Sequence, residues 1–226
     1  GQRSFMKDVH STISQRSVLF ASAPTGIGKI VATLFPEIKS LPQHKFDKIF
    51  YLTAKTATRS VAGKAINDLR SAGLILRTIT LQSKESMCPC QEIYCEPLMC
   101  KYADGYYDRL SDGISSLLTN HEITPERVIR VAEKHMLCPH ELSLDVSILC
   151  DVIIGDYNHA FNPRVKLERY FSTPDLHHVL LVDEAHNLVD RSRDMFSASL
   201  TMTSLNDCQR AVSGMDARVD ASLADI

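Results

Sequence analysis

The chain has 226 residues, of which 44% are apolar and 23% are charged, and its formal net charge is −2. This length can bury one substantial core, so we expect one domain or two small ones. No apolar run approaches the roughly 18 residues that a bilayer-spanning helix needs, and no charged-then-apolar leader opens the sequence. We therefore expect a cytoplasmic protein without a membrane partner, and the small net charge argues against a uniformly basic nucleic-acid coat.

The first half of the sequence alternates strand and helix signals. The apolar run 17–22 predicts a strand, followed by a glycine-bearing turn and a helix that extends to Phe35. Residues 48–53 predict a second strand, 57–69 a helix, and 74–81 a third strand. The same stretch is locally basic, with eight bases against two acids between residues 39 and 77. This excess is typical either of a phosphate-facing surface or of a solvated helix face, and the charge count does not choose between them.

From about residue 84 to residue 150 the alternation stops. This part is first rich in cysteine and then helical, and Thr124-Pro125 predicts the start of a helix through His135. Strand signals return at 152–155 and 179–182, and amphipathic helix follows Asn187. The pattern predicts an α/β fold in which a parallel sheet of the P-loop (RecA-like) class is flanked by helices and carries a mainly helical, cysteine-rich insertion.

Residues 23–30, Ala-Pro-Thr-Gly-Ile-Gly-Lys-Ile, predict a phosphate-binding loop. Thr25, Gly26 and Gly28 would form a tight turn at the start of a helix, where backbone N–H groups bind anions, and Lys29 would reach the terminal phosphates of a nucleotide. Ile30 departs from the pattern because serine or threonine there would bind Mg²⁺. Thr33 lies nearly one turn further along, so we do not expect it to substitute.

An acidic motif ends the last predicted strand. Asp183 and Glu184 follow Val179–Val182, and parallel sheets bind ligands at the carboxyl ends of their strands. Asp183 is predicted to hold Mg²⁺ and Glu184 to act on the attacking water, with His186 linking the site to a further domain. Without other motifs, two acids and a histidine in a tetrapeptide such as 183–186 usually do no more than end a strand in solvent. The phosphate loop upstream favours a nucleotide site.

The chain has seven cysteines. We do not expect them to form disulfides, because the cytosol keeps thiols reduced and a chain of this size needs no disulfide framework. Cys88, Cys95, Cys100 and Cys138 form the candidate metal-ligand set, with Cys90 able to replace Cys88. Four thiolates suit zinc or a [4Fe-4S] cluster, and spacing alone favours zinc slightly. Cys150 and Cys208 are expected to have packing roles.

With these motifs in place, the chain resembles the XPD/DinG-type superfamily 2 iron-sulfur DNA helicases, specifically the bacterial DinG-like branch. The resemblance runs from Gln2 to about Leu200 and rests on segments that agree in order and spacing. They are GQR, APTGIGK, YLTAKTATRS, CKYADGYYDR, CPHELSLD, DVIIGDYNHAFNP and LVDEAHNLVDRSRDMFSA.

The resemblance implies an ATP-dependent helicase that moves along single-stranded DNA, usually 5′ to 3′, and has a role in DNA repair. ATP and Mg²⁺ would be its cofactors, with Gln2 at the adenine. It also implies a [4Fe-4S] cluster rather than zinc on the four candidate cysteines. Thr53, Lys55, Thr56 and Arg59 would contact the DNA backbone. Tyrosines within 102–107 would either stack on bases or pack in a helix core.

The resemblance further implies a domain division. Residues 1–83 and 151–200 would form the first motor domain, 84–150 the cluster-bearing insertion, and 201–226 the start of a further helical insertion. The second motor domain, with its arginine fingers, is missing from the sequence, so we expect this polypeptide alone to be inactive as a helicase. The alternative, favoured by Ile30, is a non-catalytic nucleic-acid-binding remnant that holds a cluster or zinc.

Overall fold

The structure is a computed structural model that describes residues 1–22, 28–41, 46–172, 177–213, 218 and 221–222. The first half contains α1 (Gln2–Ser14), α2 (Lys29–Ser40), β1 (Lys48–Leu52), α3 (Thr56–Ser71), β2 (Thr78–Thr80), α4 (Lys84–Met87), α5 (Tyr106–Leu118) and β3 (Glu122–Ile123). The second half contains α6 (Pro125–His135), α7 (Pro139–Ser147), β4 (Val152–Gly155), α8 (Asn158–Phe161), α9 (Glu168–Phe171), β5 (His178–Val182), the 3-10 helix η1 (Ala185–Asn187), α10 (Leu188–Phe196) and α11 (Met202–Val212).

Within the described residues, five strands form one sheet in the order β3-β2-β4-β1-β5, and every pairing is parallel. The inner strand β1 pairs with β4 on one side and with β5 on the other, so that Leu52 lies opposite both Gly155 and Val182. These three residues end their strands together. The loops that follow them therefore meet at one edge of the sheet.

Alternate side chains of the inner strands β1 and β4 enter two different cores. Ile49 and Tyr51 of β1 pack with helices α2 and α3 on one face. Phe50 and Leu52 pack on the other face, in a larger cluster that includes residues of α5, α6 and α7. A strand that is buried on both faces is expected to be continuously apolar, as β1 and β4 are.

The predicted fold class is confirmed, because a parallel sheet flanked by helices carries a mainly helical stretch between β2 and β4. The strands expected at 48–53, 152–155 and 179–182 are present as β1, β4 and β5. The helix expected at 57–69 is α3, and the predicted cap of α6 is formed by the Thr124 hydroxyl, which accepts a hydrogen bond from the Arg127 backbone N–H at 3.4 Å.

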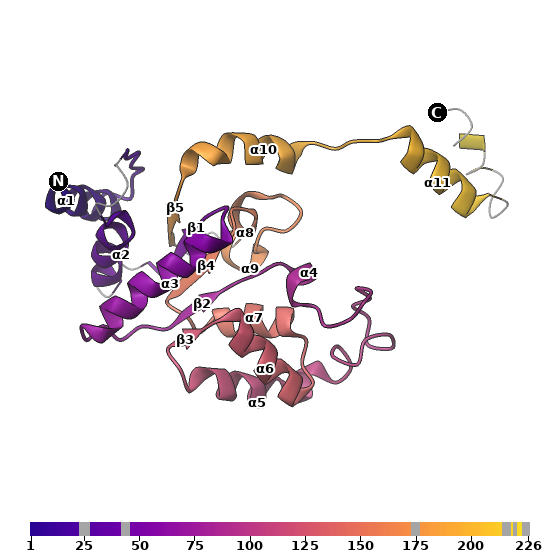
Figure 1. Ribbon diagram of the computed structural model, residues 1–226, viewed down its shortest axis with the longest axis horizontal. Helices are drawn as coiled ribbons and strands as arrows, with labels where there is room; N and C mark the ends of the chain where they lie inside the picture. Colours follow the sequence, from indigo (N-terminus) through magenta and orange to yellow (C-terminus); the bar gives the residue numbers. More distant parts are fainter. Residues whose placement is uncertain (23–27, 42–45, 173–176, 214–217, 219–220, 223–226) are drawn as a thin grey trace.

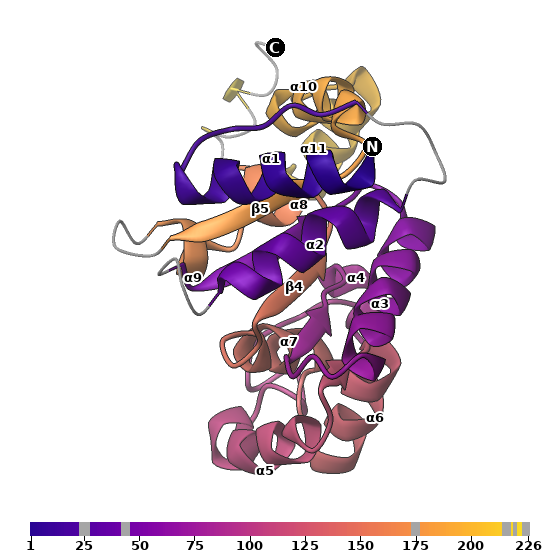
Figure 2. The ribbon, with the colours of Figure 1, turned by 90° about the vertical axis from the view of Figure 1, so that its left-hand side faces the viewer.

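The predicted strand at 17–22 is wrong, since this stretch is coil and pairs with no strand of the sheet among the described residues (Figure 2). Val18 and Phe20 are 79% and 91% exposed, so their apolar side chains gain nothing from burial there. An unpaired strand has neither ladder hydrogen bonds nor a covered face to stabilise it. Two other bounds also differ: α2 continues past Phe35 to Ser40, and the strand expected at 74–81 is only Thr78–Thr80.

The region from 84 to 150 is an insertion in sequence but not a separate core. It contributes the short strand β3, which pairs with β2, and its helices bury Leu117, Val128 and Leu142 against the sheet. Gly113 of α5 permits this packing, because a Cβ atom there would lie 2.4 Å from a methyl group of Leu137. Helix α11, in contrast, has no buried residue among those described and lies far from the sheet in Figure 1.

Candidate nucleotide site and cysteine region

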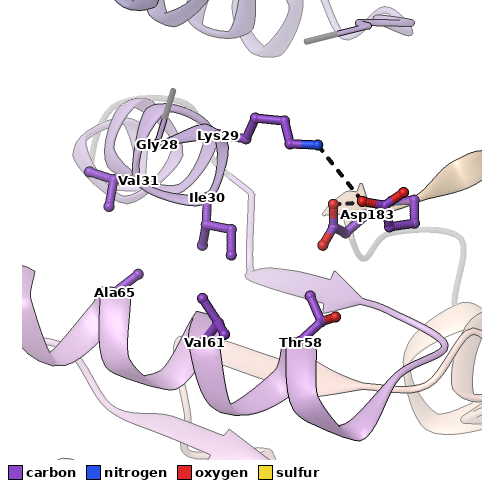
Figure 3. A pocket seen from close by; sticks show the side chains of 9 residues that line it. Gly28, Lys29, Ile30, Val31, Thr58, Val61, Ala65 and Asp183 are labelled. Atoms are coloured by element: carbon purple, nitrogen blue, oxygen red, sulfur yellow. Dashed lines mark hydrogen bonds and ion pairs between the residues drawn. The ribbon is translucent and has the colours of Figure 1, made fainter. Parts of the chain in front are cut away.

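The acidic strand end and the predicted phosphate-loop lysine lie together at one edge of the sheet. Asp183 follows directly after β5, and its backbone N–H donates to the Leu52 carbonyl of β1 at 2.9 Å. Lys29 is the first residue of α2, and its ammonium lies 3.8 Å from a carboxylate oxygen of Glu184 (Figure 3). Residues about 150 positions apart in sequence therefore form one site. Thr25 and Gly26 lie outside the described residues.

The start of α2 also brings Gln2 to this place. Gly28 has a φ of +74° and precedes the helix as its N-cap. A Cβ atom on Gly28 would lie 2.9 Å from the side-chain nitrogen of Gln2, so the two residues are in close contact and a larger residue at 28 would displace the amide. The residue predicted at the adenine thus lies beside the end of the phosphate loop.

An open pocket of about 420 Å³ lies between the start of α2, helix α3 and the strand end. Lys29, Asp183 and Glu184 supply its charged groups. Its other wall is apolar, since Ile30 points toward Val61 and Ala65 of α3 (Figure 3). Ile30 also packs against the core beneath α2 and α3, so its side chain has a packing role in place of the hydroxyl that the loop pattern predicts.

His186 extends the charged edge outward. Its Nδ1 atom lies 3.5 Å from the second carboxylate oxygen of Glu184, and its side chain is 73% exposed. Glu184 therefore lies between Lys29 on one side and His186 on the other. The exposed ring agrees with the predicted role of His186 as a contact to a further domain, although that role remains a prediction.

Two tyrosines that the sequence analysis missed hold this strand end. The Tyr51 hydroxyl donates to the Asp183 carboxylate at 2.8 Å, and the Tyr157 hydroxyl donates to the backbone carbonyls of Asp183 and Glu184. Burial, followed by the charge of Asp183, raises the pKa of Tyr51, so its hydroxyl remains a donor. Burial likewise raises the pKa of Tyr157. The sequence indicates only that a buried tyrosine hydroxyl needs a hydrogen-bond partner, and it does not say which group is that partner.

The four residues predicted to contact DNA differ in their surroundings. Thr53 is 1% exposed, and its hydroxyl accepts from the Lys55 backbone N–H at 3.4 Å. Lys55 is exposed at the N-terminus of α3, and Thr56 begins that helix. The Arg59 guanidinium instead pairs with Asp156 at 3.0 Å, where both side chains are largely buried.

Asp156 is the centre of a small charged network. Its second carboxylate oxygen pairs with Arg191 of α10 at 3.2 Å, so that one carboxylate joins α3 to the helix that follows the acidic strand end. The Asp156 backbone N–H donates to the His159 ring at 3.0 Å, and burial lowers the pKa of His159 to about 4. Arg59 in this arrangement stabilises the protein's own structure.

Much of the locally basic stretch is also used internally. The Lys48 ammonium donates to the carbonyls of Ile148 and Cys150, and the Arg77 guanidinium donates to that of Leu149. Arg70 donates to the carbonyls of Leu76 and His121, among others. Lys39, Lys55 and Lys64 are exposed, and Lys45 lies outside the described residues. The stretch is therefore not one continuous phosphate-facing surface.

The cysteine region is organised differently. The Cys90 thiol lies close to the thiols of Cys100 and Cys88. Burial, followed by these two neighbours, raises the pKa of Cys90. The Cys95 thiol is exposed and accepts a hydrogen bond from the Lys84 ammonium at 3.4 Å. Burial alone would lower the pKa of Lys84, but this hydrogen bond and nearby charges raise it. Within the described residues, no three histidine, cysteine or acidic side chains are arranged to hold a metal ion.

The tyrosines near the cysteines divide between the two expected roles. Tyr106 is buried, and its hydroxyl donates to the Asp145 carboxylate at 2.8 Å, so it belongs to the helix core. Tyr107 is 83% exposed, and its ring lies edge-to-face with that of Tyr106 at a centroid distance of 5.3 Å, so its stacking role stays a prediction. Cys150 is buried, in agreement with a packing role, whereas Cys208 is exposed on α11.

The DEAD_2 family matches this chain over residues 55–205, which is well over half of its length. The chain belongs to the DEAD_2 family. The match covers α3, the cysteine region and the acidic strand end. The resemblance to XPD/DinG-type superfamily 2 helicases is thereby confirmed, together with the similarities below.

Curated relatives include the regulator of telomere elongation helicase 1 homolog of Caenorhabditis elegans, which is 24% identical over 250 residues and covers 92% of this chain and 25% of its own length. The XPD/RAD3 helicase subunit of general transcription and DNA repair factor IIH from Saccharomyces cerevisiae is 25% identical over 126 residues. This match covers 54% of this chain and 15% of the length of the relative. The chain thus spans about a quarter or less of these relatives. Both organisms are eukaryotes, so these relatives give no support to the expected bacterial origin.

Two solved structures share the fold. One described as an XPD helicase has a TM-score of 0.68 at 19% identity and covers 99% of this chain and 38% of its own. One described as a truncated XPD has a TM-score of 0.67 at 20% identity. This match covers 97% of this chain and 62% of the other. These neighbours support the RecA-like fold class. No helix in the described ranges is long and apolar enough to span a bilayer.

Proposed function

We propose that this DEAD_2 family chain is the first motor domain of an ATP-dependent DNA helicase, which acts on single-stranded DNA in the 5′ to 3′ direction and serves DNA repair. The observation that carries the proposal is the meeting of Lys29 with Glu184, 3.8 Å apart, beside Asp183 at the carboxyl ends of parallel strands. A cation, a metal-binding carboxylate and a second carboxylate at one sheet edge are the parts that nucleotide hydrolysis requires.

Each residue at this edge has a proposed role. Lys29 neutralises the terminal phosphates of ATP, and in their absence it pairs with Glu184. Asp183 holds Mg²⁺, and Glu184 orients the attacking water. Gln2 contacts the adenine, which agrees with its position against Gly28, and Thr25 and Gly26 complete the phosphate loop. His186 extends the site toward the second motor domain.

Ile30 favours a second candidate function. Its side chain packs with the apolar wall of the pocket, so it supplies no oxygen to Mg²⁺. A chain that binds nucleotide weakly, or not at all, would instead be a non-catalytic nucleic-acid-binding module. The helicase proposal is preferred because the other parts of the nucleotide site are present and close together.

For single-stranded DNA, the proposed contacts are Lys55 and Thr56 at the start of α3, with Thr53 positioning the turn before them. Lys55 is exposed at a helix N-terminus, where it can meet a phosphate. Arg59 would have to exchange Asp156 for a phosphate, so its contribution to DNA binding requires the network around Asp156 to open. Tyr107 offers a ring on which a base can stack.

We also propose that residues 84–150 hold a [4Fe-4S] cluster through Cys88, Cys95, Cys100 and Cys138, with Cys90 as the alternative to Cys88. The donor chemistry fits, because the thiols of Cys88, Cys90 and Cys100 are neighbours and Cys138, the N-cap of α7, lies near Cys100. The present arrangement is not yet a ligand set, so binding requires the exposed segment that carries Cys95 to close over the others. A bound cluster would supply a rigid cross-link for this segment.

The domain organisation is part of the proposal. Residues 1–83 and 151–200 form the motor domain, 84–150 the cluster-bearing insertion, and 201–226 the beginning of a further helical insertion. A second motor domain, in cis or in trans, supplies the arginine fingers, without which hydrolysis is about a thousandfold or more slower. The chain alone is therefore expected to bind nucleotide without turning it over efficiently.

Titration with a fluorescent ATP analogue tests the nucleotide site. Lys29→Ala should weaken binding about tenfold or more, since it removes a charge-assisted contact to phosphate. Lys39→Ala is the matched control, because Lys39 is exposed at the other end of the same helix and should have no effect. Absence of binding by the unaltered chain at millimolar nucleotide would reject the enzyme proposal and favour the non-catalytic module.

Substitution of Ile30 by threonine sharpens the choice between the two functions. The change should strengthen Mg²⁺-dependent binding, and addition of a second motor domain should then give DNA-stimulated hydrolysis. Continued inactivity of that combination would count against a motor domain.

Anaerobic purification tests the cluster. A brown protein with broad absorption near 400 nm supports iron and sulfide on the four thiols, and alanine at Cys100 should abolish the colour. Cys208→Ala is the control because Cys208 lies on α11, outside the insertion. A colourless protein that contains zinc would overturn the iron-sulfur assignment.

A further inference from the structure

The carboxylate of Asp183 is held in one orientation by two hydrogen bonds. Its Oδ2 atom accepts from the Tyr51 hydroxyl at 2.8 Å, and its Oδ1 atom accepts from the Glu184 backbone N–H at 3.1 Å. Tyr51 lies on the inner strand β1 and is only 2% exposed, so its ring cannot move without disturbing the core. An aspartate at a strand end would otherwise sample several rotamers.

This carboxylate also keeps part of its hydrogen-bonding capacity free. A carboxylate has about four lone-pair sites, and each oxygen of Asp183 uses one of them in these contacts. Within the part of the chain that the structure describes, Asp183 forms no salt bridge, whereas its neighbour Glu184 pairs with Lys29. Asp183 is therefore fixed in direction and not neutralised by a basic side chain. That combination suits a residue that is to receive a cation.

Tyr157 holds the backbone of the same turn. Its side chain is fully buried, and its hydroxyl donates to the Asp183 carbonyl and, at 3.0 Å, to the Glu184 carbonyl. Glu184 has a φ of +53° and a ψ of +44°, a left-handed conformation that residues other than glycine rarely adopt. The Asn187 side chain also donates to the Glu184 carbonyl, at 3.2 Å. Such a conformation persists only where its surroundings hold it.

We propose that Tyr51 and Tyr157 are positioning residues of the nucleotide site: Tyr51 fixes the Asp183 carboxylate for Mg²⁺, and Tyr157 fixes the turn that directs Glu184 toward Lys29. The inference rests on the proposed nucleotide site and deepens it. Phenylalanine would fill the same volume at either position, so a purely packing role would not require the hydroxyl groups. Each hydroxyl instead reaches the one acidic turn that the site uses.

The experiment compares the magnesium-dependent part of nucleotide binding in three variants. Tyr51→Phe and Tyr157→Phe remove the two hydroxyl groups, and Tyr106→Phe is the matched control. Tyr106 also loses a hydroxyl that donates to a carboxylate at 2.8 Å, but its partner is Asp145 in the insertion. A fluorescent ATP analogue is titrated in EDTA and again in saturating Mg²⁺, and the ratio of the two affinities is the readout.

Tyr51→Phe should reduce that ratio about tenfold, since a hydrogen bond to a charged group is lost, while affinity in EDTA stays within about twofold of the unaltered chain. Tyr157→Phe should reduce the ratio in the same direction, and Tyr106→Phe should leave it unchanged. A merely structural role would lower both affinities together and leave the ratio as it is.

An unchanged ratio in Tyr51→Phe overturns the proposal, as does an equal loss in Tyr106→Phe. If Tyr51→Phe does not fold, Tyr157→Phe decides by the same ratio. Failure of the unaltered chain to bind the analogue in either condition is a different result, because it rejects the nucleotide site itself and the inference with it.

Discussion

The acidic strand end and the cysteine segment, residues 88–104, are the two candidate sites of this chain, and they are built in opposite ways. At the strand end, Asp183 follows a hydrogen-bonded parallel strand and is contacted by a buried tyrosine. The cysteine segment contains no helix or strand, and its side chains are mostly exposed. Among the described residues, the Cys95 thiol accepts one hydrogen bond, from Lys84.

This difference shows how a site obtains its order. Parallel strands in register deliver their carboxyl ends to one edge, so the geometry of the strand end is complete without a ligand. A loop of thiols has no such framework, and the free energy that orders it has to come from the metal group that it binds. We therefore expect the strand end to be rigid in the free protein and the cysteine segment to become rigid only when loaded.

The largest effect is expected from Leu142, because it lies in the core that the sheet shares with the insertion that carries the cysteine segment. Leu142 of α7 is fully buried in the core that contains both sheet and insertion residues. Leu142→Ala should lower the free energy of unfolding by about 2–5 kcal/mol through lost burial and a residual cavity. Denaturation monitored by circular dichroism should show one cooperative transition shifted to lower denaturant.

Leu200→Ala is the control for this prediction, since Leu200 is 73% exposed and its loss should change stability by less than about 0.5 kcal/mol. Two separate transitions, one for the insertion and one for the sheet, would show that the regions do not share a folding unit and would contradict the common core.

Asp156 tests the strand-end side of the comparison. Asp156→Ala leaves the Arg59 guanidinium, whose side chain is 11% exposed, without its carboxylate partner. Removing one partner of a buried ion pair typically costs about 3–5 kcal/mol, and we expect about 3 kcal/mol because Arg191 is more exposed. Urea denaturation measures the loss.

The matched control is Asp190→Ala, which removes a pair with Arg193 where both side chains are at least 75% exposed. That change should be close to neutral. Equal effects of the two substitutions would mean that the network around Asp156 does not hold α3 to α10.

Glu37 of α2 makes the helix that carries Lys29 sensitive to pH. The side chain is 2% exposed, one carboxylate oxygen has no hydrogen-bond partner among the described residues, and burial raises its pKa well above 4.5. The native state then holds a proton that the unfolded state releases. Stability is therefore greatest below about pH 4.5 and falls as pH rises toward the folded-state pKa.

Glu37→Gln removes this titration, so the variant should be more stable than the unaltered chain at pH 8, by about 1–3 kcal/mol, and similar to it at pH 4.5. Glu133→Gln on an exposed face of α6 is the control and should leave the pH dependence unchanged. Parallel pH profiles for the Glu37→Gln variant and the unaltered chain would show that Glu37 does not carry the proton.

The same contrast explains what the sequence could predict. Strand and helix periodicity placed β1, β4, β5 and α3, and parallel topology then implied that Lys29 and Glu184 meet. The coil at 17–22 was not predictable, because an apolar run becomes a strand only if a neighbouring strand accepts it. The charge count left the roles of Arg59 and Arg70 open, since their partners are distant in sequence. The sequence indicates only a core position for Tyr51, because its contact with Asp183 depends on the three-dimensional fold.

The smallest effect on stability, and the sharpest test of the contrast, comes from thiol labelling. Burial raises the pKa of Cys150 from 9.0 to about 12. Because the thiolate is the reactive form and each pKa unit is a factor of ten, Cys150 at pH 8 has roughly a thousandfold less thiolate than a thiol with its ordinary pKa. Exposed Cys95 and Cys208 should therefore react with iodoacetamide while Cys150 does not, as mass spectrometry of peptides can show.

Metal loading should protect Cys95 but not Cys208, since only Cys95 belongs to the proposed ligand set. Equal protection of both would place the metal elsewhere, and labelling of Cys150 at the rate of Cys95 would contradict its buried position.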